Sequence, residues 1–185
     1  SHESQQVHAC LFPADKEPKE AKSFGLSSLS LLRLTSKTET SKYLIIKRSM
    51  SLSTFPGKMA TPGGFVDADD KSLIRTAMRE LEEETGCGWL QHVNITQAQP
   101  HAILDSVPTP SRHNVTVIIK FNGEVKDGIS FEQLRQEMVL QDGEVDDAFF
   151  LTLDEIKTRL DEFTPGLAKL FGSLSQESER VMWSD

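Results

Sequence analysis

Three glutamates near the end of one predicted helix are the residues best suited to carry chemistry in this chain. Glu80, Glu83 and Glu84 fall within an arc of roughly 100° at about 100° per residue, whereas Glu82 points away from them. Carboxylates that lie this close repel one another unless a cation lies between them. A hard divalent ion suits oxygen ligands, and Mg²⁺ is the usual ion where phosphates also bind. The pattern therefore indicates a site for Mg²⁺ or Mn²⁺ with a phosphate-bearing substrate.

The alternative is that these glutamates form a solvated helix face, which is the commoner role of such a run. Two features favour a function here. Negative charge near the C-terminus of a helix opposes the helix dipole, so this placement costs stability. The helix also follows the turn Pro62-Gly63-Gly64, whose backbone can approach a metal or a phosphate closely.

The segment that carries these residues closely resembles the Nudix box. It runs Gly64-x5-Asp70-x8-Arg79-Glu80-Leu81-x-Glu83-Glu84-x-Gly86-Cys87. The family pattern is Gly, five residues, Glu, seven residues, then Arg-Glu-aliphatic-x-Glu-Glu-x-Gly-aliphatic. Asp70 stands where the family has Glu, and one extra residue precedes Arg79. We expect both departures to fall in the first turn of the helix, outside its metal-binding half. Cys87 in place of an aliphatic residue is a mild change.

The resemblance implies roles for the matching residues. Glu80 and Glu84 would be the main metal ligands, and Glu83 would bind a further ion or activate water. Arg79 would orient the glutamates through charge-assisted hydrogen bonds, the alternative being an ordinary surface ion pair. The backbone carbonyl near Gly63 would complete the metal shell.

The implied reaction is hydrolysis of a phosphoanhydride, which needs neutralised phosphate charge and an aligned water. Bound divalent ions would supply both. A general base is also needed, and in this family it lies in the box or on a later loop. Glu144, in the acidic segment 141–147, is our candidate. The alternative for Glu144 is a solvated acidic turn.

Residues before the box bear on the substrate. The segment 44–64 resembles a signature of coenzyme A diphosphatases, except that Ser53 stands where that subgroup has Arg and Thr61 where it has Phe. This suggests a nucleoside diphosphate-linked substrate of the coenzyme A or dinucleotide type. The pattern Leu-x-x-Lys-Arg is also common across Nudix proteins, because that strand ends beside the phosphates. Lys47 and Arg48 are therefore candidate substrate-binding residues.

Two other functions stay open. The segment 110–114 is similar to a stretch in Nudix proteins assigned to mRNA caps, which suggests a 5′-triphosphate or cap of RNA as substrate. Arg112 and His113 would then contact phosphates, and Phe65 or Trp89 would stack on a base. For Arg112 and His113 the alternative is a polar pair at a strand edge. The remaining hypothesis is a Nudix-fold binding or scaffold subunit with little activity, against which the intact box glutamates weigh.

The predicted elements are those of an α/β domain. Helices are predicted from Asp69 and Asp70 to Gly86, at residues 130–138 with Ser130 as N-cap, and from Thr152 or Asp154 to about residue 163. A further helix is expected to pack on the core within residues 164–185, and residues 49–64 are expected to form a loop. Strands are predicted at residues 6–12, 26–34, 43–46, 114–121 and 145–151, with a hairpin between the second and third of these. The resemblance implies a Nudix fold, with a mixed β-sheet between helices.

Composition sets further limits. The 185 residues, 37% of them hydrophobic, suit a single domain, with residues 1–5 a tag remnant or tail. The net charge of −8 argues against a broad basic surface for nucleic acid. No apolar run approaches the roughly 18 residues that cross a bilayer, so we expect no membrane partner. A homodimer or a partner protein stays open.

Two cysteines, Cys10 and Cys87, are too few for a disulfide framework or a thiolate zinc site. We therefore expect free thiols in a reducing intracellular compartment, either the cytoplasm or an organelle such as the mitochondrion. Ser1-His2 resembles a cloning remnant, so the sequence leaves a natural leader open.

Overall fold

The computed structural model describes residues 23–175, with the backbone alone described at residues 107–109. The predicted strand at residues 6–12 and the end of the C-terminal segment lie outside these residues. The strands are β1 (Ser23–Thr35), β2 (Lys42–Arg48), β3 (Met59–Ala60), β4 (Gly63–Phe65), β5 (Val93–Thr109), β6 (Arg112–Val125) and β7 (Val145–Leu151). The helices are α2 (Leu73–Thr85), α3 (Phe131–Gln136), α4 (Leu153–Lys157) and α5 (Pro165–Ser173), with 3₁₀ turns η1 (Gly88–His92) and η2 (Leu160–Glu162).

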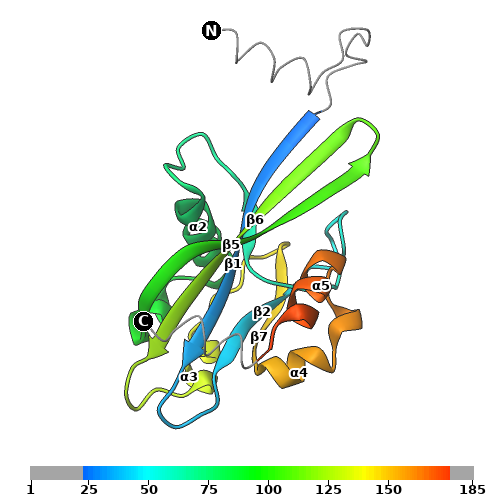
Figure 1. The fold of residues 1–185 in the computed structure, drawn as a ribbon. Coiled ribbons are helices and arrows are strands. Elements are labelled where there is room, and N and C mark those ends of the chain that lie inside the picture. Colours follow the sequence, from blue (N-terminus) through cyan, green and yellow to red (C-terminus); the bar gives the residue numbers. More distant parts are fainter. Residues whose placement is uncertain (1–22, 176–185) are drawn as a thin grey trace, which may run out of the picture.

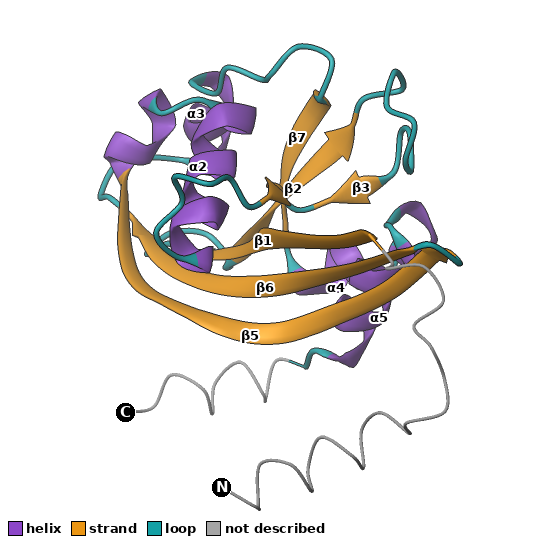
Figure 2. Ribbon diagram, turned by 90° about the horizontal axis from the view of Figure 1, so that it is seen from above, coloured by secondary structure: helices purple, strands orange, loops and turns teal. Residues whose placement is uncertain are grey.

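A mixed β-sheet built around β1 is the frame of the fold (Figure 1). β6 runs parallel to β1 along its whole length, and β5 pairs antiparallel with β6, so three long strands form one curved layer (Figure 2). On its other side β1 pairs antiparallel with β4 and, further along, with β2, which lies between β3 and β7. Figure 1 shows α2 on one side of β1 and the pair α4 and α5 on the other. This arrangement confirms the predicted α/β class with a mixed sheet between helices.

Most predicted elements are confirmed. The hairpin joins β1 to β2 with Arg33 opposite Tyr43. Ser130 caps α3, since its hydroxyl accepts a hydrogen bond from the Gln133 backbone N–H at 3.1 Å. The strands expected at residues 26–34, 43–46, 114–121 and 145–151 correspond to β1, β2, β6 and β7.

The start predicted for α2 is wrong. The helix begins at Leu73, and Ser72 is its N-cap, accepting from the Arg75 backbone N–H at 3.0 Å. Asp70 lies in the preceding turn, where its carboxylate accepts from the Asp67 backbone N–H at 2.9 Å. Aspartate favours such local turns because its short side chain reaches nearby backbone N–H groups. Asp70, which departs from the Nudix pattern, therefore lies before the helix, not in its first turn.

Two β-structural features were missed. Residues 49–64 are not all loop, because β3 pairs with β2 and β4 pairs with β1. β5 was not predicted, because its sequence contains Pro100 between polar residues such as Gln97 and Gln99. Proline is tolerated in an edge strand, and β5 is the edge of this sheet, stabilised by its long antiparallel pairing with β6.

The helical segments after β7 are shorter than predicted. Thr152, one of the two expected caps, begins α4 in a capping box with Glu155. However, α4 ends at Lys157, and the 3₁₀ turn η2 follows it. α5 ends at Ser173, and Leu167 and Phe171 are buried as the predicted core-facing side of this helix.

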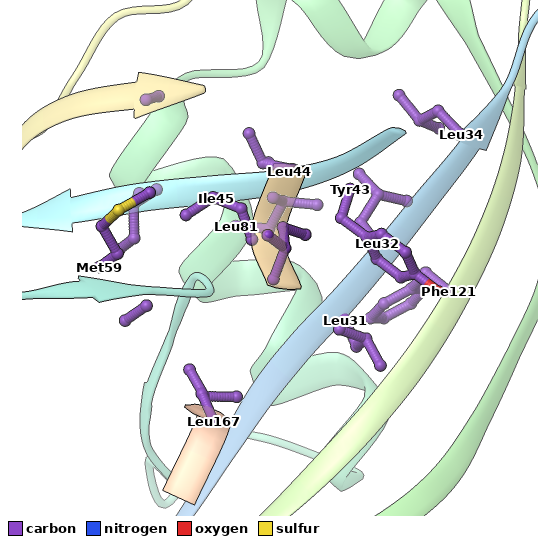
Figure 3. Packing of buried hydrophobic residues seen from close by; sticks show 14 of the residues in the cluster. Leu31, Leu32, Leu34, Tyr43, Leu44, Ile45, Met59, Leu81, Phe121 and Leu167 are labelled. Carbon is purple, nitrogen blue, oxygen red and sulfur yellow. The ribbon is translucent and has the colours of Figure 1, made fainter. Parts of the chain in front are cut away.

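The core holds α2 against the sheet and thereby fixes which of its residues face outward. Ala77 and Leu81 of α2 are fully buried. Figure 3 shows Leu81 of α2 and Leu167 of α5 among the core side chains of β1 and β2. Burial of a leucine side chain contributes about 1.5–3 kcal/mol. The apolar stripe of α2 is thus anchored, and its glutamates are carried on the remaining faces.

Within residues 23–175, no helix is long and apolar enough to span a membrane. Cys87 is an exposed free thiol, and Cys10 lies outside the described residues.

Candidate active site

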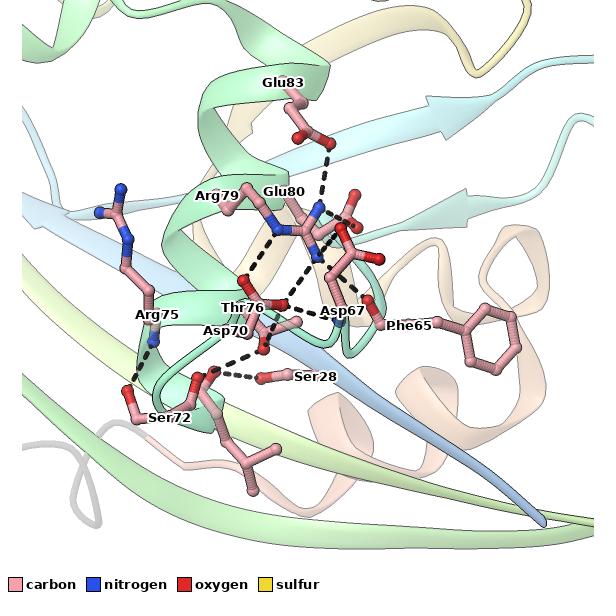
Figure 4. Close-up of polar contacts among 11 residues, drawn as sticks. Ser28, Phe65, Asp67, Asp70, Ser72, Arg75, Thr76, Arg79, Glu80 and Glu83 are labelled. Atoms are coloured by element: carbon pink, nitrogen blue, oxygen red, sulfur yellow. Dashed lines mark hydrogen bonds and ion pairs between the residues drawn. The ribbon is translucent and has the colours of Figure 1, made fainter.

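Arg79 is the centre of a polar network that joins α2 to the turn before it (Figure 4). Its Nε and Nη2 atoms donate to the two carboxylate oxygens of Asp70, at 3.0 and 2.9 Å. Nη2 also donates to the backbone carbonyl of Phe65 at 3.1 Å. Nη1 donates to Glu80 at 2.9 Å and to Glu83 at 3.1 Å. Arg79 therefore links two box glutamates to the end of β4, which is more than an ordinary surface ion pair.

The charges in this network stabilise one another. The hydrogen bonds from Arg79 hold the pKa of the Asp70 carboxyl far below its ordinary value, with a further contribution from the Asp67 backbone N–H. The same contacts raise the pKa of the Arg79 guanidinium, with Asp70 as the largest cause. Thr76, on the first turn of α2, also donates its hydroxyl to Asp70 at 2.9 Å. No role was predicted for Asp70 or Thr76, although Asp70 is a position of the box.

Glu84 is a buried carboxylate with an unused acceptor. The residue is 7% exposed, and its Oε2 atom has no hydrogen-bond partner among the described residues. Burial raises the pKa of Glu84 well above its ordinary value, and the negative charges of Glu80 and Glu144 raise it further. A hydrogen bond from the Gly63 backbone N–H and the positive charge of Arg48 act in the opposite direction. Four residues, Glu80, Glu144, Gly63 and Arg48, therefore act on this one carboxylate.

Glu80 lies directly against the glycine turn. A methyl group added at Gly64 would lie 2.4 Å from the Oε1 atom of Glu80, which is closer than real contacts allow. Residue 64 must therefore lack a side chain for Glu80 to occupy this position. Burial is the largest cause that raises the pKa of Glu80, and the hydrogen bond from Arg79 opposes it. Glu83, in contrast, is exposed on the outer side of Arg79.

Backbone hydrogen bonds bring Glu144 to this site. The loop after α3 is bound to the end of α2, because the Gln141 N–H donates to the Glu84 carbonyl at 3.1 Å. The Ser49 N–H donates to the carbonyl of Glu144 at 2.9 Å, which ties the same loop to the end of β2. Arg48, the last residue of β2, donates from Nε and Nη2 to the carbonyl of Thr54 at 3.1 and 2.8 Å.

Several other predicted residues lie elsewhere. Lys47 lines a cavity on the opposite face of β2, beside Phe149. The ring of Phe65 is 53% exposed and points away from Arg79, which only its carbonyl contacts (Figure 4). Trp89 is fully buried and donates from Nε1 to the Thr85 hydroxyl at 3.0 Å, so its ring is not available to a base.

Arg112 and His113 contact residues of β4, β5 and β6. The guanidinium of Arg112 lies 5.6 Å from the ring centre of Phe65 and donates from Nε to Asn114 at 3.1 Å. His113 makes a close contact with the carboxylate of Asp105 on β5. Both side chains are thus engaged by other residues of the sheet.

The donor chemistry of the site fits a divalent cation. The buried unpartnered oxygen of Glu84, the carboxylate of Glu80 and the close backbone of Gly64 form a set of hard oxygen donors. Over residues 23–175, however, no three acidic, histidine or cysteine side chains are gathered as a ready-made metal site. Glu80 and Glu83 each accept a hydrogen bond from Arg79 instead.

Comparison with known proteins agrees with this geometry. The sequence profile described as NUDIX domain matches residues 28–172. The chain belongs to the Nudix family. An uncharacterized Nudix hydrolase, NudL, of Yersinia enterocolitica is 36% identical over 97 residues, which cover 51% of this chain and 44% of that relative. The chain thus spans less than half the length of this curated relative.

Solved structures of the family share the fold. The NUDIX domain of Shewanella oneidensis NrtR, complexed with ADP ribose, has a TM-score of 0.59 and 22% identity, covering 95% of this chain and 98% of that one. A bifunctional NMN adenylyltransferase/ADP ribose pyrophosphatase of Francisella tularensis, complexed with AMP and a Mn ion, has a TM-score of 0.59 and 16% identity, covering 91% of this chain and 44% of that one. At these identities the likeness establishes the Nudix fold alone.

Proposed function

We propose that this Nudix protein is a metal-dependent pyrophosphohydrolase that cleaves a phosphoanhydride bond in a nucleoside diphosphate-linked substrate. The observation that carries the proposal is the buried, unpartnered Oε2 atom of Glu84 beside Glu80 and Glu144. A carboxylate oxygen left without a partner in a protein interior is costly, and it persists where a ligand completes it.

In this proposal the metal is Mg²⁺ or Mn²⁺, held by Glu80 and Glu84 with Glu83 and the backbone carbonyl near Gly63. When bound, such an ion neutralises phosphate charge and lowers the pKa of a coordinated water. Arg79 keeps Glu80 and Glu83 in place through Nη1 and anchors itself on Asp70. It acts as a positioning residue, since its contacts are to these carboxylates and to the Phe65 carbonyl.

The chemical step follows from the remaining residues. Arg48 lies close enough to act on the charge of Glu84, so it is placed to attract the phosphates of the substrate. Glu144, whose charge also acts on Glu84, accepts the proton of the attacking water. A bond then forms between the water oxygen and one phosphorus, the bridging P–O bond breaks, and two phosphate monoesters leave.

The substrate class rests on two supports. The segment 44–64 resembles the coenzyme A diphosphatase signature, and the similar NrtR domain of Shewanella oneidensis was solved with ADP ribose. Both compounds contain a nucleoside diphosphate with a group attached at the far phosphate. An RNA 5′ end is less well supported, because Arg112 and His113 are engaged with Asn114 and Asp105.

A substrate panel with and without metal tests the proposal. Phosphate or nucleotide release is measured with Mg²⁺, Mn²⁺ or EDTA on coenzyme A, ADP ribose, other dinucleotides, nucleoside triphosphates and 5′-triphosphorylated RNA. We expect metal-dependent cleavage of coenzyme A or a dinucleotide. Glu80→Gln should lower kcat by about 100-fold, as loss of a directly acting charged group does. Glu82→Gln, on the outer side of α2, is the matched control and should stay within about twofold of the wild type.

Other results of the panel have clear meanings. Cleavage of triphosphorylated RNA alone would replace the proposal with the RNA 5′-end hypothesis. Tight nucleotide binding without release from any compound would identify a scaffold subunit instead.

A further inference from the structure

A cavity of about 370 Å³ opens at the far end of β2, and neither the box nor the proposed reaction uses it. Its walls come from the end of β2, the loop before β3, β7 and the segment after α4. The residues that line it are Lys47, Met50, Pro56, Gly57, Lys58, Met59, Phe149, Arg159, Asp161 and Glu162.

This cavity lies on the opposite face of β2 from the carboxylate site. Tyr43 of β2 packs against Phe171 of α5, with ring centres 5.6 Å apart, so odd-numbered residues of β2 face α4 and α5. Lys47 follows this alternation and lines the cavity. Arg48 lies on the other side, where its charge acts on Glu84. Figure 1 shows the corresponding separation of α2 from α4 and α5 by the strands.

The charges around the cavity leave an excess of cations. Lys47, Lys58 and Arg159 supply three positive charges against two from Asp161 and Glu162. Arg159 and Glu162 neutralise each other through two hydrogen bonds of 2.6 and 3.1 Å. Arg159 is the main cause that lowers the pKa of Glu162, and Lys47 and Lys58 lower it further, so both ammonium groups act on the same space.

The rest of the lining is apolar and accessible. Met50 is 67% exposed, and Phe149 forms a wall with the Arg159 guanidinium 5.9 Å from its ring centre. Gly57 has φ +69, and a methyl group added there would lie 2.5 Å from the Met50 sulfur, so this glycine makes room for Met50. A ligand that fits these walls has an anionic group for the lysines and an apolar or aromatic part for Met50 and Phe149.

We propose that this cavity binds the phosphate group of a small molecule, with Lys47 and Lys58 contacting the phosphate and Met50 and Phe149 contacting its apolar part. The phosphate belongs either to a distant part of the substrate or to a separate ligand. None of the glutamates of α2 lines this cavity.

Hydrogen bonds connect the cavity to the loop that carries Glu144, the candidate base. Ser51 donates its hydroxyl to the Gly143 carbonyl at 3.1 Å, and the Met50 N–H donates to the Asp146 carboxylate at 3.1 Å. These residues flank Glu144, so a ligand that orders Met50 also acts on the loop that carries the candidate base.

Titration calorimetry of phenyl phosphate binding in EDTA tests the proposal without any turnover. We expect saturable 1:1 binding that the double variant Lys47→Gln/Lys58→Gln weakens at least about tenfold, since it removes both charge-assisted contacts to the phosphate. Lys169→Gln, an exposed lysine of α5 outside the cavity, is the matched control and should bind as the wild type does. The single variant Lys47→Gln, at an exposed position, gives the same test should the double variant fail to fold.

Absence of binding, or equal binding by the wild type and the lysine variants, would overturn the proposal and leave the hydrolase proposal untouched. Two substrates that differ by one phosphate monoester then identify the source. If the lysine variants raise KM only for the substrate that carries the extra phosphate, the phosphate is part of the substrate. If KM is unchanged for both while phenyl phosphate binding is lost, the ligand is a separate molecule.

Discussion

The carboxylate of Asp70 accepts two side-by-side hydrogen bonds from the guanidinium of Arg79, at 3.0 Å from Nε and at 2.9 Å from Nη2. Asp70 stands in the turn before α2, whereas the Nudix pattern has a glutamate one residue nearer to the arginine. The shorter side chain and the extra residue still bring a carboxylate to the same guanidinium. Because Nη1 of Arg79 holds Glu80 and Glu83, Asp70 sets the position of both glutamates.

Replacing Asp70 with asparagine should therefore impair the site indirectly, through Arg79. We expect Asp70→Asn to lower kcat by about 10-fold, as changes to groups behind the ligands do. The variant should also unfold at lower denaturant concentration at pH 7. Because the pKa of Asp70 is lowered in the folded protein, its contribution is complete above its ordinary pKa of 3.8 and is lost as the pH falls below it. In denaturant melts between pH 7 and pH 3 the difference between the two proteins should begin to narrow below about pH 5, because the contribution of Asp70 is fully lost only at its folded-state pKa, which lies far below 3.8.

Asp69→Asn, an exposed neighbour of Asp70, is the control for this experiment. A difference between Asp70→Asn and the wild type that persists unchanged at pH 3 would mean that the ion pair is not its cause.

Elements with strong local patterns were predicted well. β2 is an uninterrupted apolar run, and α2 has apolar residues spaced by three and four, so local sequence is sufficient for both. β5 could not be predicted in this way, because what holds it is pairing with β6, a partner that a local pattern does not reveal. The start of α2 was misjudged because Asp69 and Asp70 suit both a helix start and a turn, and the contacts of Asp70 with Arg79 and Asp67 decide for the turn.

The predicted site residues show the same difference between local patterns and long-range contacts. Glu80, Glu83, Glu84 and Arg79 lie together because they share one helix, whose geometry is known from sequence. The approach of Glu144 depends on loop contacts with Ser49 and Glu84, so sequence order alone suggested it only through family resemblance. Lys47 and Arg48 are neighbours in sequence, but Lys47 lines the cavity beside Phe149 whereas the charge of Arg48 acts on Glu84. The pairing of β2 with β7 is irregular between these two residues, so their joint assignment to one substrate site did not foresee this separation.

The buried charge of Glu84 should reduce the stability of the metal-free protein. Glu84→Gln removes that charge, and we expect the free energy of unfolding at pH 8 in EDTA to rise by about 1–3 kcal/mol. The pKa of Glu84 is raised in the folded protein, so the wild type regains stability as the pH falls toward the ordinary value of 4.5. The advantage of the variant should therefore shrink with falling pH in denaturant melts.

Adding Mg²⁺ should make the wild type more stable than Glu84→Gln. The ion should raise the melting temperature of the wild type and leave that of Glu84→Gln nearly unchanged, because only the ionised carboxylate binds it strongly. Glu82→Gln should respond to pH and to Mg²⁺ as the wild type does. A Glu84→Gln protein that still gains full stability from Mg²⁺ would place the metal elsewhere.

A side chain at residue 64 should displace the carboxylate of Glu80. In Gly64→Ala the new methyl group would lie 2.4 Å from the Oε1 atom of Glu80, so the carboxylate must move. We expect kcat to fall by about 10- to 100-fold and a higher Mg²⁺ concentration to be needed for half-maximal rate. The control is Gly172→Ala in α5, where the nearest atom would be at an ordinary 3.5 Å. Equal metal dependence in Gly64→Ala and the wild type would contradict the role of this close approach.

Glu144 should accept a proton from the attacking water. Glu144→Gln keeps the size of the side chain but not its basicity, and loss of a general base lowers kcat by about 100-fold or more. Metal binding, read as the Mg²⁺-induced rise in melting temperature, should persist because Glu80 and Glu84 are unchanged. Asp142→Asn, an exposed acid of the same loop, should retain wild-type kcat. Full turnover in Glu144→Gln alongside its loss in Glu84→Gln would move the base from this loop to the helix.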